Sequence, residues 1–170
     1  MIKNSPVRLL TYSALFSALA VLGSGVYFPL GPVKVFPFQH AINVMAGIMI
    51  GPWYGMLAAA IAGLVRLMLG TGTVFAFPGG IPGAFVVGIG YHLIIHRDWI
   101  GFFEPVGTVL IGATLSAYVV APLVGRTATL YFFQMAFLVS CLPGSVIGFF
   151  LIKILRKVNW LNPGFIKGDE

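Results

Sequence analysis

Charged residues are scarce in this chain, and acidic residues are the scarcest of them. Of the 170 residues only 8% are charged and four are Asp or Glu, whereas 59% are hydrophobic and the mean hydropathy is +1.00. A soluble domain of ordinary composition carries about a quarter charged residues. This inventory cannot cover a water-exposed surface, so lipid must cover most of a single membrane domain, residues 1–170.

Several motifs that would supply energy or catalysis are also missing. The sequence has no G-x-x-x-x-G-K-[ST] phosphate loop, no H-E-x-x-H and no G-x-S-x-G. Cys141 is the only cysteine, which excludes a disulfide within the chain. We expect no carboxylate inside the membrane, because all four acids fall on the predicted inner side: Asp98, Glu104, Asp169 and Glu170. The sequence therefore predicts a protein that is not an enzyme and has no cofactor, metal or ATPase of its own.

Glycine and proline divide the apolar residues into six runs, which predicts an all-α integral membrane bundle of six transmembrane helices. The predicted spans are residues 9–28, 36–50, 53–70, 83–96, 102–124 and 128–157. A spanning helix needs about 20 residues. Four runs reach that length, whereas the second and fourth are short, and the second is separated from the third only by Gly51-Pro52.

The distribution of Lys and Arg predicts the orientation of the bundle. With the N-terminus inside, the inner side holds Lys3, Arg8, Arg97, Lys153, Arg156, Lys157 and Lys167, and the outer side holds Lys34, Arg66 and Arg126. Cytoplasmic loops carry the excess of basic residues in membrane proteins. We therefore predict that both termini lie on the cytoplasmic side of the cell membrane (N-in, C-in).

The first apolar run has some features of a signal peptide. Lys3 and Arg8 precede it, and residues 18–20 have the A-x-A form of a cleavage site. Because five further apolar runs follow, we expect the first run to remain as a membrane span.

Polar and aromatic residues of several runs fall at one depth, in the predicted outer third. Ionisable and polar groups within a bilayer usually face the bundle interior or a cavity. Such groups on mostly apolar walls are typical of a small-molecule pocket. The residues expected to line it are Phe36, Phe38, Gln39, His40, Asn43, Arg66, Phe75, Phe77, Pro78, Gly79, Tyr118, Tyr131 and Gln134.

Most of these residues also have a purely structural explanation. Arg66 can extend its charge to the headgroups. His40 and Asn43 lie three positions apart and can hydrogen-bond between helices. Tyr118 and Tyr131 can belong to the interfacial aromatic belt. Their shared depth, rather than any one residue, favours the pocket.

Residues 77–83 form the most distinctive stretch, with three glycines and two prolines among seven residues. Proline fixes the backbone and removes a donor, and glycine permits turns and close approach to a ligand. The stretch is either a simple connection between helices or, as we expect, a shaped loop that forms a wall of the pocket.

Two histidines and two acids lie near the predicted inner side. His92 and His96 are four positions apart, a spacing that can hold a metal, but no Cys, Asp or Glu on the same helix completes a site. Asp98 and Glu104 lie close to Arg97, and we expect interfacial ion pairs there.

The chain resembles the substrate-binding S components of energy-coupling factor (ECF) vitamin transporters, and within them the ThiW family. The resemblance covers nearly the whole chain. It rests on the six apolar spans, on Ala14-Leu15-Phe16-Ser17-Ala18, and on Arg66-Leu67-Met68-Leu69-Gly70-Thr71-Gly72-Thr73 followed by Phe77-Pro78-Gly79-Gly80-Ile81-Pro82-Gly83-Ala84.

This resemblance implies a role and a set of partners. S components bind a vitamin or its precursor from outside and dock on an EcfT-like membrane coupling subunit, while two cytoplasmic ATPases supply the energy. By analogy, Ala14 and Ala18 would form the docking face, which small side chains suit. For the ThiW family the implied substrate is a thiamine precursor, hydroxyethylthiazole. Such a ring would stack on Phe36, Phe38, Phe75, Phe77 or Tyr131, and Gln39, His40, Asn43 and Gln134 would meet its polar atoms.

Other readings stay open at this point. The ligand can be thiamine itself, the pyrimidine precursor or another small heteroaromatic vitamin. The chain can also be an autonomous small membrane facilitator, or a membrane enzyme or assembly factor that uses His92, His96 and Glu104.

Overall fold

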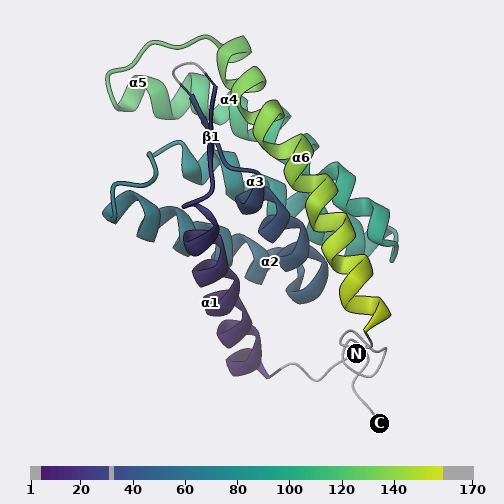
Figure 1. Ribbon diagram of the computed structural model, residues 1–170. Coiled ribbons are helices and arrows are strands. Elements are labelled where there is room, and N and C mark those ends of the chain that lie inside the picture. Colours follow the sequence, from purple (N-terminus) through teal and green to yellow (C-terminus); the bar gives the residue numbers. More distant parts are fainter. Residues whose placement is uncertain (1–4, 31–32, 159–170) are drawn as a thin grey trace.

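The computed structural model describes residues 5–30 and 33–158, and most of these residues are helical (Figure 1). Helix α1 (Pro6–Gly23) begins where Ser5 Oγ accepts a hydrogen bond from the Arg8 N–H at 3.3 Å, a normal N-cap followed by a proline. A short antiparallel hairpin follows, formed by β1 (Phe28–Leu30) and β2 (Val33–Val35), with Phe28 opposite Val35. The hairpin leads into helix α2.

Helix α2 (Pro37–Met68) is folded back on itself at Gly51. Gly51 has φ 83° and ψ 177°, which is not helical, and Pro52 follows it. A Cβ built on Gly55 would lie 3.3 Å from the backbone nitrogen of Gly47, although eight residues of straight helix cover about 12 Å. The two arms, residues 37–50 and 52–68, therefore lie against each other, and both ends of α2 reach the same end of the bundle.

The next crossings are less regular. Helix α3 (Ala76–Ile89) continues as the π-helical turn η1 (Gly90–Ile94). The following 98–123 segment alternates helix types: η2 (Asp98–Phe103), η3 (Val106–Gly112), α4 (Ala113–Leu115), η4 (Ser116–Val120) and α5 (Ala121–Leu123). Helix α6 (Leu130–Lys157) starts at Thr129, whose Oγ1 accepts a hydrogen bond from the Phe132 N–H at 3.2 Å.

Within the described part of the chain, five helices are long and apolar enough to cross a membrane: Pro6–Gly23, Pro37–Met68, Ala76–Ile94, Asp98–Leu123 and Leu130–Lys157. The protein is thus a multi-pass membrane protein. The predicted second and third spans are the two arms of α2, so the break at Gly51-Pro52 was correctly placed, but the count of six spans stays a prediction. The proposed orientation also stays a prediction.

The stretch 77–83 is helical, and the expected shaped loop is therefore wrong. It forms the first two turns of α3, which begins at Ala76. Pro78 lies in the first turn, where a helix needs no N–H from it. The connection that remains between α2 and α3 is the short 69–75 segment.

The two ends of the bundle carry different segments of the chain. One end, here called the hairpin end, carries β1–β2, the 69–75 segment and the 124–129 segment; the opposite end carries the start of α1 and the end of α6 (Figure 1). A core of Val44, Ile48, Val87, Ile100 and Ile152 joins α2, α3, η2 and α6.

We predict that Gly51→Ala destabilises the protein by about 1–3 kcal/mol, because its backbone conformation is essentially restricted to glycine. An added Cβ would meet His92 Nε2 at 3.7 Å, an ordinary contact, so the cost is conformational. Thermal unfolding of the purified protein in detergent measures the effect. Gly25→Ala is the matched control, since Gly25 is exposed and has no positive φ. Equal melting temperatures for the two variants would contradict this account of the fold-back.

Candidate functional site

A cavity of about 820 Å³ opens at the hairpin end. Its walls come from β2, both arms of α2, the 69–75 segment, α3, the 124–129 segment and α6. Buried side chains such as Gln39 and Arg66 form its inner part, and the exposed Thr71, Arg126 and Thr129 form its mouth. Its volume lies within the range of small-molecule sites, about 300–1,000 Å³.

One wall of the cavity is aromatic. Phe75 lies against Phe133 with ring centroids 4.8 Å apart, and Phe133 lies 5.6 Å from Phe132 and 6.0 Å from Phe137. Phe133 and Phe137 are four positions apart on α6 and so share a helix face. These tilted and edge-to-face rings form an apolar surface on which a planar ligand can stack.

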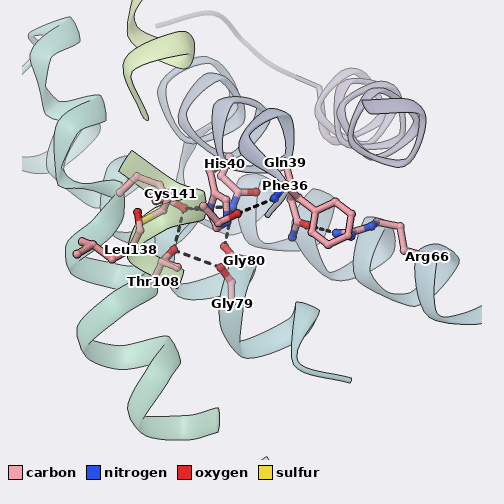
Figure 2. A network of polar contacts seen from close by, with 12 residues as sticks. Phe36, Gln39, His40, Arg66, Gly79, Gly80, Thr108, Leu138 and Cys141 are labelled. Atoms are coloured by element: carbon pink, nitrogen blue, oxygen red, sulfur yellow. Dashed lines mark hydrogen bonds and ion pairs between the residues drawn. The ribbon is translucent and has the colours of Figure 1, made fainter. Parts of the chain in front are cut away.

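Arg66 lies beside this wall and is almost fully buried, with 1% of its surface exposed. Its Nη1 donates to Gln39 Oε1, and its guanidinium lies 4.2 Å from the centroid of the Phe36 ring (Figure 2). The 69–75 segment, which follows α2, folds back over Arg66, because the N–H groups of Thr71 and Gly72 both donate to the Arg66 carbonyl at 3.0 Å. Arg66 does not reach out to the headgroups, and the fold-back of α2 explains why it meets Gln39.

A buried polar cluster around Glu104 lies directly behind the cavity wall. Glu104 Oε1 is 2.7 Å from His40 Nδ1, and it accepts hydrogen bonds from Thr108 Oγ1 at 2.8 Å and from Asn43 Nδ2 at 3.4 Å. Asn43 also donates to the Gly80 carbonyl at 3.2 Å. Figure 2 shows His40 of α2, Gly80 of α3 and Thr108 of the 98–123 segment close together in this cluster. Since His40 also lines the cavity, Glu104 fixes the orientation of a side chain in the wall.

The expectation that no carboxylate lies within the membrane is wrong. Glu104 is fully buried and belongs to the 98–123 segment, which is apolar enough to span. The expected ion pair with Arg97 is also wrong for Glu104. Asp98 does form an ion pair at the segment's start, but with Arg156, at 2.8 Å. The physical reason is that this segment begins at Asp98 rather than at residue 102, which carries Glu104 into the bundle.

The structure brings together only part of the predicted site. Six of the expected residues line the cavity: Phe36, Gln39, His40, Arg66, Phe75 and Gly79. Asn43 and Pro78 are buried close by without lining it, and Phe38, Phe77 and Gln134 also lie outside the lining. Ligand contact by any of these residues stays a prediction.

Tyr118 and Tyr131 are not placed in the cavity, which corrects the expectation for them. Their side chains are 67% and 68% exposed. Helix phase explains both positions. Ser116, Ala117 and Ala121 are the buried residues around Tyr118, and on α6 Phe133 is buried two positions beyond Tyr131. Such exposed tyrosines fit the interfacial aromatic belt instead.

Sequence reasoning missed many lining residues of α6 and of the cavity mouth. They are Lys34, Gly70, Thr71, Gly72, Thr73, Ala76, Arg126, Thr127, Ala128, Thr129, Phe132, Phe133, Ala136, Phe137 and Ser140. A usable signal existed on α6, where Phe133, Phe137 and Ser140 recur at helical spacing. Ser140 also has a structural task, because its Oγ accepts a hydrogen bond from the Phe36 N–H at 2.8 Å.

His92 contacts the backbone of α2 and does not belong to a metal site formed by the described residues. Its Nε2 lies 3.1 Å from the Ile48 carbonyl oxygen, close to the fold-back of α2. In residues 5–30 and 33–158 no group of three or more His, Cys, Asp or Glu side chains is placed to hold a metal ion.

We predict that Glu104→Ala destabilises the protein by about 3–5 kcal/mol, because it leaves the polar partners of a buried carboxylate unsatisfied. Glu104→Gln keeps the shape and one carbonyl acceptor, so it should cost less. Thermal unfolding in detergent without ligand measures both. Asp98→Asn is the control, since the Asp98–Arg156 pair is partly exposed and should matter less. A normal melting temperature for Glu104→Ala would show that the cluster does not hold the bundle together.

Comparison with known proteins agrees with this geometry. The family model described as "Thiamine-precursor transporter protein (ThiW)" matches residues 10–158. Among solved structures, the chain is similar to the S-component for biotin from an ECF-type ABC transporter, with a TM-score of 0.58 and 22% identity over 94% of this chain and 95% of that one. At that identity the likeness shows the fold alone. No curated protein matches the chain. The chain, a multi-pass membrane protein with the fold of an ECF S component, belongs to the ThiW family of thiamine-precursor transporter proteins.

Proposed function

We propose that this protein is the high-affinity substrate-binding subunit of an ECF-type ABC importer and that it takes up a thiamine precursor, with hydroxyethylthiazole as the first candidate. The observation that carries the proposal is the cavity of about 820 Å³ at the hairpin end, walled by phenylalanines and edged by hydroxyl groups. A thiazole ring would stack on the aromatic wall, and its polar atoms would meet Gln39, His40 or Ser140.

The charge distribution supports an outward-facing cavity. The described Lys and Arg residues divide unequally between the two ends. Lys34, Arg66 and Arg126 line the cavity at the hairpin end, and the other five lie away from it, towards the opposite end: Arg8, Arg97, Lys153, Arg156 and Lys157. By the positive-inside rule the hairpin end faces outside. The fold-back of α2 supports a total of six membrane crossings. Because this number is even, the N-terminus and the C-terminus would both lie on the cytoplasmic side.

Helix α1 supports docking to a membrane partner. It buries Ser13, Phe16, Ser17 and Ala20 against the bundle and leaves the opposite face uncovered, including Ala14 and Ala18. Small residues on an uncovered face allow a partner helix to approach closely. We therefore assign Ala14 and Ala18 to contact with an EcfT-like coupling subunit, which two cytoplasmic ATPases would drive.

The alternatives differ in measurable ways. Thiamine or the pyrimidine precursor would also present a heteroaromatic ring to the same wall, and competition binding distinguishes them. An autonomous facilitator would carry its substrate into liposomes that contain this chain alone, without ATP or partners. That result would contradict the importer proposal.

The first prediction from this proposal concerns the ligand. Isothermal titration of the purified chain with hydroxyethylthiazole should show binding without partners, and Phe133→Ala should weaken it about tenfold or more by removing the central ring of the wall. Leu142→Ala is the control, because Leu142 is an exposed residue of α6 outside the lining. Absence of binding to the wild-type chain would remove hydroxyethylthiazole as the substrate.

The second prediction concerns docking. Ala14→Trp should reduce ATP-dependent uptake by the reconstituted complex more than tenfold and leave ligand binding unchanged, because a bulky ring prevents close helix contact. Leu19→Trp is the matched control, since Leu19 is exposed on α1 but lies about 100° around the helix from Ala18. Normal uptake by Ala14→Trp would show that this face of α1 is not the docking surface.

A further inference from the structure

The cavity has an unbalanced charge. Lys34, Arg66 and Arg126 line it, and no Asp or Glu is among its described lining residues. Two acids fall within residues 5–30 and 33–158, and both are already engaged. Asp98 pairs with Arg156 and Glu104 with His40. Within the described chain, therefore, no acidic side chain neutralises the cations of the cavity.

Arg66 is the cation for which this imbalance matters most. It is 1% exposed, and its Nε has no hydrogen-bond partner among the described residues. Its two contacts, the Gln39 side-chain carbonyl and the Phe36 ring, are both neutral. A buried charge is costly unless it is paired and hydrogen-bonded. Lys34 and Arg126 differ, because they are exposed at the mouth, where water can solvate them.

The surroundings of Arg66 hold its guanidinium in one place. Phe36 covers its face at 4.2 Å, Gln39 holds one nitrogen, and a Cβ on Gly72 would lie 3.0 Å from Arg66 Cβ, so the 69–75 segment packs over its stem. A fixed guanidinium with free donors matches a carboxylate or phosphate in a bidentate manner. Hydroxyl groups of Thr73, Thr127, Thr129 and Ser140 on the same lining can donate to further oxygens of such a group.

We propose that the molecule carried by this protein has an anionic group, a carboxylate or a phosphate monoester, which binds the Arg66 guanidinium while its ring lies on the aromatic wall. Lys34 and Arg126 attract the same charge at the mouth of the cavity. The inference rests on the proposed uptake of a heteroaromatic thiamine precursor, and it replaces the first candidate, the neutral hydroxyethylthiazole, with an anionic derivative. The neutral alcohol hydroxyethylthiazole would occupy the ring site but leave Arg66 without a counter-charge.

The test compares three ligands by isothermal titration to the full chain in a non-ionic detergent. They are hydroxyethylthiazole, its phosphate monoester and the thiazole in which a carboxylate replaces the alcohol. We expect at least one anionic ligand to bind tenfold or more tightly than the alcohol. Arg66→Gln should abolish that preference while leaving the affinity for the alcohol within about threefold, and Arg66→Lys should restore part of it, because lysine keeps the charge but loses the fork.

Two controls separate the Arg66 site from general electrostatic attraction. Arg126→Gln should reduce the affinity for the anionic ligands a few-fold, in a manner that added salt diminishes. Arg97→Gln, which removes an exposed charge away from the cavity, should leave all three affinities unchanged. If Arg66→Gln fails to fold, the ligand preference of the wild-type chain still decides the question.

The remaining outcomes distinguish the failure of this inference from that of the proposed function. Equal binding of the alcohol and the anionic ligands would overturn the anion site and leave the importer proposal intact. If no thiazole binds but inorganic phosphate raises the melting temperature of the wild type and not of Arg66→Gln, the anion site stands and the thiazole assignment fails. If native mass spectrometry instead finds an anionic lipid held by the wild type and lost in Arg66→Gln, a headgroup occupies the site and the inference about the carried molecule is wrong.

Discussion

The buried contact between Glu104 and His40 is the interaction on which the cavity depends. Inside a bilayer, polar groups must find their partners within the protein, because lipid offers none. Glu104 Oε1 meets side chains from the first arm of α2 and from its own segment, and Asn43 and Thr108 extend these contacts to the carbonyls of α3. This contact fixes the start of α2, where Gln39 precedes His40. Gln39 in turn holds Arg66, so the cavity's deepest charge is positioned through the Glu104 cluster.

Hydropathy and residue spacing were sufficient for the outline of this fold. The apolar runs predicted the membrane-spanning helices, and Gly51-Pro52 marked the point where α2 turns back, since glycine alone readily adopts that backbone conformation. Placing polar residues by depth also brought Gln39, His40 and Arg66 into one region, because a helix pair joined by a tight turn must return to the same end. The family resemblance rested on the apolar spans and on residues 14–18, 66–73 and 77–84.

Depth alone could not show which way a side chain points. Residues close in sequence to Tyr118 and Tyr131 face the interior of the bundle. Only the phase of each helix shows that the two tyrosine rings point outward. In the 98–123 segment even the phase is hidden, because its 3₁₀ and π turns change the number of residues per turn. Glu104 lies between two such turns, and its burial could not be read from a helical wheel. Long-range pairing with His40 decides its position.

The attachment of α1 has a mechanical consequence. Ser13 and Ser17 donate hydrogen bonds to the carbonyls of Tyr54 and Ala58, at 3.1 and 3.0 Å, so α1 is fastened to the second arm of α2. That arm carries Arg66 in its last turn, and the 69–75 segment closes over it. A displacement of α1 would therefore be passed on through this arm to Arg66 in the cavity. Helix α6, which carries the phenylalanines, packs instead on the first arm of α2, at Gly144 and Gly148. Displacement of one wall relative to the other would loosen the grip on a ligand without unfolding either helix.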